Sequence, residues 1–340
     1  MNARTRPHTP PDRRRQTGLT LVEIMVAMVL SLVLLGGVIQ IFASTRQTHR
    51  VQEAVSRMQE SGRMALEFLA RDIRMADFWG CASSIDKVTN HLDSTGTGFV
   101  DYAAGGIGGT EGGTGGADSL ILRGGFNSGL TVQSPYGPLP SAVVKVNANN
   151  NLQQGDVVFV SDCTAADIFQ ITNADPDTSG NLVHNTGSSV TPGNINASDP
   201  ACPGANAHCL SKVYGADATV YQVQQLVYSI QNGAAGQPAL FRNGQEIVDG
   251  IEDLQILYGE DLDARGSPGF GTADYYVPAN QVVDMERVVS IRVAVVVRSY
   301  EDNLSTGAQN YTVLGDQRTA ADNRLRQVYS DTVAIRNRLP

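Results

Sequence analysis

The chain has 340 residues, of which 17% are charged, so it is long enough for a substantial core and is not a disordered polyelectrolyte. Its net charge is −9, but residues 1–18 hold five arginines and one acid. Taking these from totals of 25 and 34 leaves 20 basic and 33 acidic residues, a net charge of −13. This acidity argues against nucleic-acid binding, which needs clustered basic residues. Only three residues are lysine: Lys87, Lys145 and Lys212.

Residues 19–42 form an apolar run of 24 residues, which would be about 36 Å long as a helix and could span a bilayer. The arginines before it predict a cytoplasmic N-terminus and an exported C-terminal part. A secretory signal peptide fits poorly, because the run is long and no clear cleavage site follows it. An ordinary signal anchor explains everything except Gly18 and Glu23, and a carboxylate in such a segment costs roughly 2.5–3.5 kcal/mol.

Residues 18–23, G-L-T-L-V-E, resemble the processing site of type IV pilins and type II secretion pseudopilins. The resemblance implies that a prepilin peptidase cleaves after Gly18 and N-methylates Leu19. It also implies that Glu23 pairs with the N-terminal amine of a neighbouring subunit, which would neutralise a costly buried charge. The alternative is a glutamate that extends to the membrane interface. The sequence departs from the family in having Leu19 where Phe is usual and in its long leader of 18 residues.

The helix is predicted to continue beyond the membrane to Ala76, because no proline interrupts residues 19–76 and apolar residues recur every three or four positions. These residues are Val51, Val55, Met58, Gly62, Ala65, Leu69 and Ala76. Gly36 and Gly37 are the weak point, either a hinge or a site of close helix packing. The expected divisions are a leader (1–18), a transmembrane assembly helix (19–42), an amphipathic helix (43–78) and a periplasmic β-rich domain (79–340).

After Ala76, runs rich in β-forming residues alternate with turn-rich segments, which predicts an antiparallel sheet packed on the amphipathic helix. The predicted fold is therefore α+β. The runs are residues 119–124, 142–146, 156–162, 219–231, 286–300 and 326–337. Two long loops are expected: a glycine-rich, flexible one at residues 103–118 and a polar one at residues 173–209.

The four cysteines all follow the membrane segment, so they face an oxidising compartment and their even number suggests disulfides. Three pairings are possible. The favoured one joins Cys202 to Cys209 and Cys81 to Cys163. A zinc site that uses His208 beside Cys209 is an alternative, but it lacks a second closely spaced pair of ligands.

The sequence contains none of the catalytic motifs that were sought: H-E-x-x-H, G-x-S-x-G and a P-loop are absent. Residues 175–180 and 260–266 begin like calcium loops, but each lacks the glutamate required at position twelve, so Asp-rich turns are expected. We therefore expect no enzyme activity, no cofactor and no metal site.

Four later segments resemble the PilW family of type IV pilus minor pilins: residues 155–163, 251–266, 288–299 and 324–340. The resemblance implies a non-catalytic subunit that primes pilus assembly in the inner membrane and then sits at the pilus tip. The implied partners are the major pilin, minor pilins of the FimU, PilV, PilX and PilE types, and a PilY-type adhesin.

Three alternative functions follow from the same features. A pseudopilin similar to GspJ of type II secretion would share the helix and a related sheet, although the length and four cysteines favour the PilW family. A membrane-anchored binding protein or adhesin would act alone and would need neither cleavage at Gly18 nor Glu23. A DNA-uptake pilin would need an exposed basic stripe, which an acidic ectodomain does not favour.

Overall fold

The structure is a computed structural model that describes residues 18–82, 85–113, 115–125, 129–137, 141–187, 189–195 and 208–339. The chain divides into two compact units, the first ending at Glu53 and the second beginning at Ala54. One long helix is followed by a region rich in strands, so the predicted α+β class is confirmed.

Helix α1 (Leu21–Met75) has 55 residues. In the first unit its side chains are exposed on all sides, and Gly36 and Gly37 are helical with open space around them. In the second unit one face is buried, as the predicted spacing requires, and Leu69 and Ile73 are completely inaccessible to solvent. The helix thus changes from uniformly apolar to amphipathic along its length.

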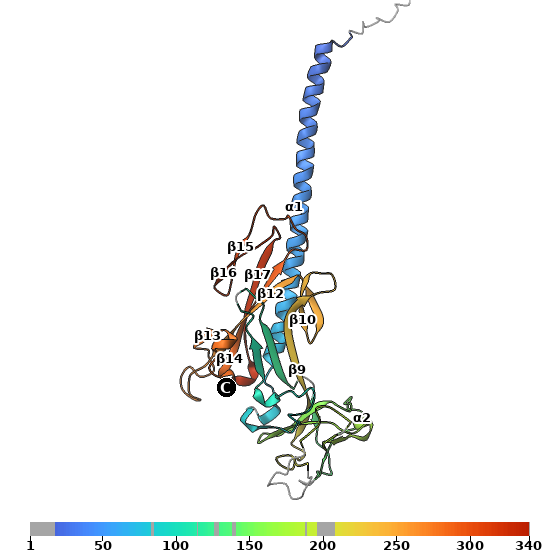
Figure 1. Cartoon of the computed structure of the whole chain (residues 1–340), viewed down its shortest axis with the longest axis vertical. Helices are drawn as coiled ribbons and strands as arrows, with labels where there is room; N and C mark the ends of the chain where they lie inside the picture. The colour runs from blue at the N-terminus through green and yellow to red at the C-terminus, as the bar shows by residue number, and fades with distance from the viewer. Residues whose placement is uncertain are drawn as a thin grey trace, which may run out of the picture. The chain divides into compact units, whose positions relative to one another are not determined.

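The first sheet has nine strands, with β9 at its centre (Figure 1). Its main path is β1-β7-β6-β9-β10-β11, while β2 pairs with β3, and β3 and β4 pair with β9. The pairing is antiparallel except between β1 and β7. The strands are β1 (Val88–Asn90), β2 (Ile107–Thr110), β3 (Ser119–Gly125), β4 (Leu130–Thr131), β6 (Val157–Ser161), β7 (Ala166–Gln170), β9 (Thr219–Asn232), β10 (Pro238–Arg242) and β11 (Gln245–Asp249).

The second sheet is antiparallel and has the order β13-β12-β14-β17. Its strands are β12 (Ile251–Glu260), β13 (Tyr275–Val277), β14 (Val288–Arg298) and β17 (Arg326–Ala334). Two further antiparallel pairs join β5 (Val143–Lys145) to β8 (Asn181–Val183) and β15 (Asn310–Val313) to β16 (Asp316–Thr319). The short helix α2 (Pro176–Ser179) precedes β8.

The strands therefore form two main sheets where the sequence predicted one. The chain passes from the first sheet to the second at Gly250, the single residue between β11 and β12. Gly250 has a φ of 75°, a conformation that glycine adopts at little cost. This one residue lets two consecutive strands belong to different sheets.

The glycine-rich segment at residues 103–118 is not wholly the flexible loop that its composition predicted, because residues 107–110 form β2 and pair with β3. Gly109 explains part of this result. A Cβ atom there would lie 2.1 Å from the Tyr258 hydroxyl and 2.5 Å from the Ser119 carbonyl oxygen. Glycine therefore permits a close approach of strands that a larger residue would block.

The main core lies between α1 and both sheets, where Leu69 and Ile73 meet Leu226, Ile256 and Val293. A second core surrounds β5 and β8 and includes Val144, Phe169 and Leu182. A third core contains Trp79 and Phe159, whose rings make an edge contact with 5.5 Å between centroids.

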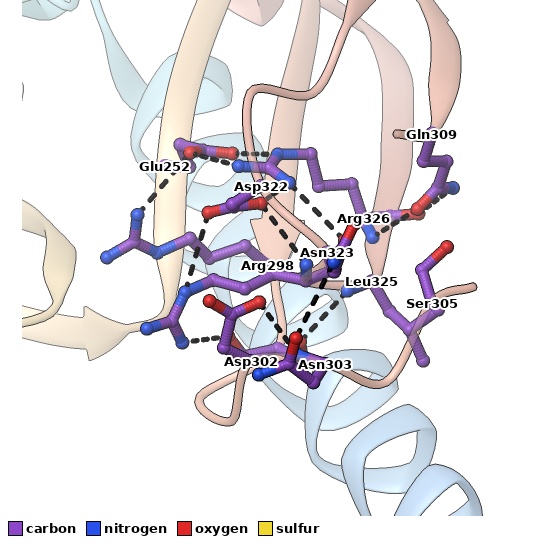
Figure 2. A network of polar contacts seen from close by, with 12 residues as sticks. Glu252, Arg298, Asp302, Asn303, Ser305, Gln309, Asp322, Asn323, Leu325 and Arg326 are labelled. Atoms are coloured by element: carbon purple, nitrogen blue, oxygen red, sulfur yellow. Dashed lines mark hydrogen bonds and ion pairs between the residues drawn. The ribbon is translucent and has the colours of Figure 1, made fainter. Parts of the chain in front are cut away.

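A polar network holds the segment between β14 and β17 to the second sheet (Figure 2). Arg326 lies between two carboxylates, with Nε 2.6 Å from Glu252 Oε2 and Nη1 2.5 Å from Asp322 Oδ1. The Gln309 side chain accepts from the Arg326 backbone N–H and donates to its carbonyl, both at 2.8 Å. Burial alone would lower the pKa of Arg326, but the bonds to Glu252 and Asp322 raise it above its ordinary value.

Candidate functional site

The predicted processing and assembly residues lie together at the start of α1. Gly18 and Leu19 precede the helix and are exposed. Thr20 caps it, since its Oγ1 accepts a hydrogen bond from the Glu23 N–H at 3.3 Å and its carbonyl accepts from Ile24 N–H at 3.2 Å. The sequence T-L-V-E has the spacing of a capping box, a signal that the sequence analysis missed.

Glu23 thus occupies the first turn of α1, where the helix dipole favours a negative charge. Its side chain is exposed in the isolated chain. The apolar residues around it are also exposed, for example Leu21 at 74% and Leu34 at 71%. A surface of this kind is stable only when lipid or other apolar helices cover it.

Among the described residues, α1 is the one helix that is long and apolar enough to cross a membrane. Its most apolar window of 18 residues has a mean hydropathy of 2.6, and none of that window is buried inside the protein. This distinguishes the segment from the core helix of a soluble domain, which would be covered by its own chain.

A buried ion pair fixes the second part of α1 to the first sheet. Asp72 is 6% exposed, and its Oδ2 accepts a hydrogen bond from the Tyr228 hydroxyl at 2.6 Å and lies 2.8 Å from Arg242 Nε. Burial, followed by the hydrogen bond to Asp72, raises the pKa of Tyr228 well above its ordinary value, so the hydroxyl remains a donor. The sequence analysis did not identify these three residues, which are far apart in the chain.

The end of α1 is closed by residues from far along the chain. Asn337 Nδ2 donates to the carbonyl oxygens of Ala76 at 2.8 Å and Met75 at 3.3 Å, two groups that the helix leaves without partners. Arg338 pairs with Asp77, whose Oδ1 also accepts from Trp79 Nε1 at 2.8 Å. The C-terminal segment of the second unit thereby acts as a cap for its helix.

The structure contains the Cys81–Cys163 disulfide, which links the segment after α1 to the turn between β6 and β7. Cys209 is also disulfide-bonded, so its thiolate is not available to zinc. Cys202, its expected partner, lies outside the described residues. Within the described part of the chain, no cysteine is free.

Three aspartates, Asp261, Asp263 and Asp274, bring carboxylate oxygens within 4.8 Å of one another in the loop after β12. Two of them already accept hydrogen bonds from backbone N–H groups of the loop. Asp261 accepts from the backbone N–H groups of Asp263 at 2.9 Å and Gly271 at 2.7 Å, and Asp274 accepts from Leu262 N–H at 2.7 Å. This arrangement agrees with the Asp-rich turn expected from the sequence.

Two family models match the chain. The prokaryotic N-terminal methylation motif covers residues 13–39, and type IV pilus-assembly protein W covers residues 227–337. These two matches support a type IV pilus minor pilin of the PilW family. Both families are structural pilus components and not enzymes, and the methylation motif with an apolar helix fits inner-membrane anchoring followed by entry into a pilus.

One curated relative is similar to part of the chain. The chain is 39% identical over 59 residues to the pilin-like protein PilA3 of Thermus thermophilus. The matched stretch is 17% of this chain and 25% of the relative, so the chain spans about a quarter of the length of the relative it matches. No solved structure matches the chain.

Proposed function

We propose that this PilW-family pilin is cleaved between Gly18 and Leu19, N-methylated at Leu19 and assembled at the tip of a type IV pilus. In this proposal residues 1–18 are the leader, 19–42 the assembly helix, 43–78 the amphipathic helix and 79–340 the periplasmic domain. The mature subunit would prime assembly together with minor pilins of the FimU, PilV, PilX and PilE types. It would also help to hold a PilY-type adhesin above the major pilin.

The observation that carries the proposal is Glu23 in the first turn of an exposed apolar helix. Before assembly, the carboxylate near the helix end can reach the membrane interface. In a filament the surrounding apolar side chains would be covered by other helices, and a buried carboxylate then needs a cation. The free amine of a neighbouring Leu19 is a cation that processing itself would create.

The proposed topology places the N-terminus in the cytoplasm and the second unit in the periplasm. Its support is the five arginines before Gly18 and the disulfide in the second unit, which requires an oxidising compartment. Cleavage would occur on the cytoplasmic side, where a membrane-embedded prepilin peptidase could reach Gly18.

Substitution of Glu23 tests the assembly role. We expect Glu23→Ala to be inserted, processed and folded, but to enter pili and join the other minor pilins poorly, because the neighbouring amine loses its counter-ion. Glu23→Gln keeps a side chain suited to the helix cap but removes the charge. It should therefore share the assembly defect if the charge is responsible.

The measurements are pilus number and co-purification with the other minor pilins, with wild type as the reference. A defect in Glu23→Ala alone would assign the residue to helix capping. If both variants match wild type in both assays, Glu23 has no assembly role and the proposed pairing is wrong.

A further inference from the structure

The loop that follows β14 carries a short modification signal, since residues 301–305 read E-D-N-L-S. An asparagine followed two positions later by serine or threonine is the acceptor signal for an N-linked glycan, and it belongs on a surface loop of an exported protein. Bacterial acceptor signals also have an acidic residue two positions before the asparagine, and Glu301 stands there relative to Asn303. Such a short signal also arises by chance, so the surroundings of the asparagine have to support it.

The structure leaves the side-chain amide of Asn303 accessible. Asn303 is exposed, as are Glu301 and Asp302 before it. Its φ of 59° is in the left-handed region, which asparagine adopts more readily than most residues. Its Oδ1 accepts one long hydrogen bond, of 3.5 Å, from Asn323 Nδ2 (Figure 2). Its Nδ2, the atom to which a glycan is attached, has no hydrogen-bond partner among the described residues.

The residues after Asn303 hold the signal in place. Leu304 is 6% exposed, and the N–H groups of Leu304 and Ser305 both donate to the Asn323 carbonyl, at 3.1 and 2.9 Å. Ser305 Oγ donates to the Gly307 carbonyl at 2.7 Å. Asn323 follows Asn303 by 20 residues, so the signal is exported before its anchor. A transferase can therefore bind the loop in an extended form before the anchor closes, and Asn303 remains exposed once it has closed.

The other two copies of the signal differ from this one. Residues 310–312 read N-Y-T, but Asn310 begins β15 and its Oδ1 accepts a hydrogen bond from Thr319 Oγ1 at 2.8 Å. Residues 196–198 read N-A-S and lie outside the described residues. Neither copy has an acid two positions before the asparagine, where alanine and asparagine stand instead. Of the three signals, only that of Asn303 has a carboxylate at this position.

We propose that Asn303 is a site of N-linked glycosylation. The donor is an oligosaccharide carried on a polyisoprenyl diphosphate, and a membrane oligosaccharyltransferase is needed because resonance makes an amide nitrogen a weak nucleophile. Asn303 Nδ2 forms a bond to C1 of the first sugar, while the bond from C1 to the diphosphate oxygen breaks and its electron pair leaves with the diphosphate. One Nδ2 proton passes to a basic group of the transferase. The proposal rests on the proposed periplasmic location of the second unit and not on the assembly role of Glu23.

The test is mass spectrometry of the protein purified from its native host. One tryptic peptide, residues 299–318, contains both Asn303 and Asn310, so the fragmentation has to keep the glycan attached and locate it. We expect an added glycan mass at Asn303. Asn303→Gln and Ser305→Ala should abolish it, whereas Ser305→Thr should keep it, because threonine offers the same hydroxyl. Glu301→Gln should lower the occupancy, and Glu301→Asp should restore it.

Asn310→Gln is the matched control, since it removes the neighbouring signal and should leave the glycan in place. The same peptide map shows whether the Cys81–Cys163 bond has formed, which separates a failure of the proposed topology from a failure of modification. Three results would overturn the proposal: an unmodified Asn303 in protein whose disulfide has formed, a glycan that persists without the serine hydroxyl, or a glycan on Asn310 or on residues 196–198 instead of Asn303.

Discussion

Asp167 is a fully buried carboxylate that accepts hydrogen bonds from three side chains and one backbone group. His91 Nε2 lies 2.7 Å from its Oδ1, while Oδ2 accepts from the Tyr214 hydroxyl and Ser211 Oγ at 2.6 Å and from Ser211 N–H at 3.1 Å. Burial by itself raises the pKa of Asp167, but the bonds from His91, Ser211 and Tyr214 outweigh it and lower the pKa below 3.8. The ionised residue thereby holds residues 211–214 against β7.

This lowered pKa makes the contribution of Asp167 depend on pH. A carboxylate whose pKa falls on folding contributes stability above its unfolded pKa, and that stability is lost as the pH falls through the folded value. We expect Asp167→Asn to be less stable than wild type by about 1–3 kcal/mol at pH 6. The difference should shrink as the pH is lowered below 3.8.

Thermal unfolding of both proteins in detergent between pH 6 and pH 3 measures this difference. The control is Asp217, an exposed aspartate on a turn. The Asp217→Asn variant should have the same stability as wild type at every pH. If the difference in stability between wild type and Asp167→Asn stays constant across this pH range, the lost stability comes from packing and not from charge.

The sequence could suggest a candidate residue where the signal was local. Gly18, Leu19 and Glu23 are close together in the chain, and their pattern needs no tertiary information. Asp72 and Asp167 could not be found this way, because their partners lie 156 and 47 residues away in the bonds to Tyr228 and Tyr214. An isolated aspartate in a sequence carries no sign that it will be buried.

At the scale of elements, helix α1 approaches β17 closely at a small residue. Gly62 is buried, and a Cβ atom there would lie 2.3–2.7 Å from ring atoms of Tyr329. The clash would involve a ring held between the helix and the strand, not the end of a flexible chain. Gly62 therefore lets the helix and β17 approach closely.

We expect Gly62→Ala to lower the stability of the second unit by about 1–3 kcal/mol through overpacking. Gly36→Ala is the matched control, because that glycine is in the same helix and a Cβ atom added to it would meet nothing within 4 Å. Helix propensity alone predicts that each alanine would stabilise by about 1 kcal/mol. Opposite effects of the two changes in thermal unfolding would separate packing from propensity, and a stabilised Gly62→Ala would refute the close approach.

Long strands with alternating apolar residues could be predicted from the sequence. The strand β9 coincides with its predicted run to within one residue, whereas the run predicted for β14 is two residues too long at each end and the run predicted for β17 is three residues too long at its C-terminal end. The strand β7 was missed because all five of its residues are buried, including Asp167 and Gln170, so it has no alternation. The strand β2 was missed because two of its four residues are glycine, which usually signals a loop. In both cases tertiary contacts override the local preference.

At the scale of the whole molecule, the division into two units separates the processing site from the folded domain. Gly18 lies in the first unit, whereas the disulfide and the three hydrophobic cores begin after Glu53. Folding of the second unit should therefore not depend on cleavage.

We expect Gly18→Val to leave the full-length precursor in the membrane, with the Cys81–Cys163 bond formed and the second unit folded. A bulky residue at the cut would block the peptidase, while the rest of the chain is unchanged. Mass spectrometry of the N-terminus and non-reducing peptide mapping measure the two outcomes. Gln16→Val carries the same substituent two residues earlier and should be processed normally. Mature Gly18→Val protein that begins at Leu19 would refute the requirement for a small residue before the cut, and a wild-type N-terminus at another residue would refute the assigned cleavage site.

The cap on α1 also has a consequence for synthesis. The carbonyl of Ala76 leaves the ribosome 261 residues before Asn337, the side chain that will cover it. At the usual rate of synthesis of about 5–20 residues per second, roughly 13–50 s pass between the synthesis of Ala76 and that of Asn337. The second unit therefore cannot complete its fold in the order in which its residues are exported, because the helix end needs the C-terminal segment. A chain that terminates before Asn337 lacks the side chain that covers the carbonyls of Met75 and Ala76, so its helix end stays uncapped.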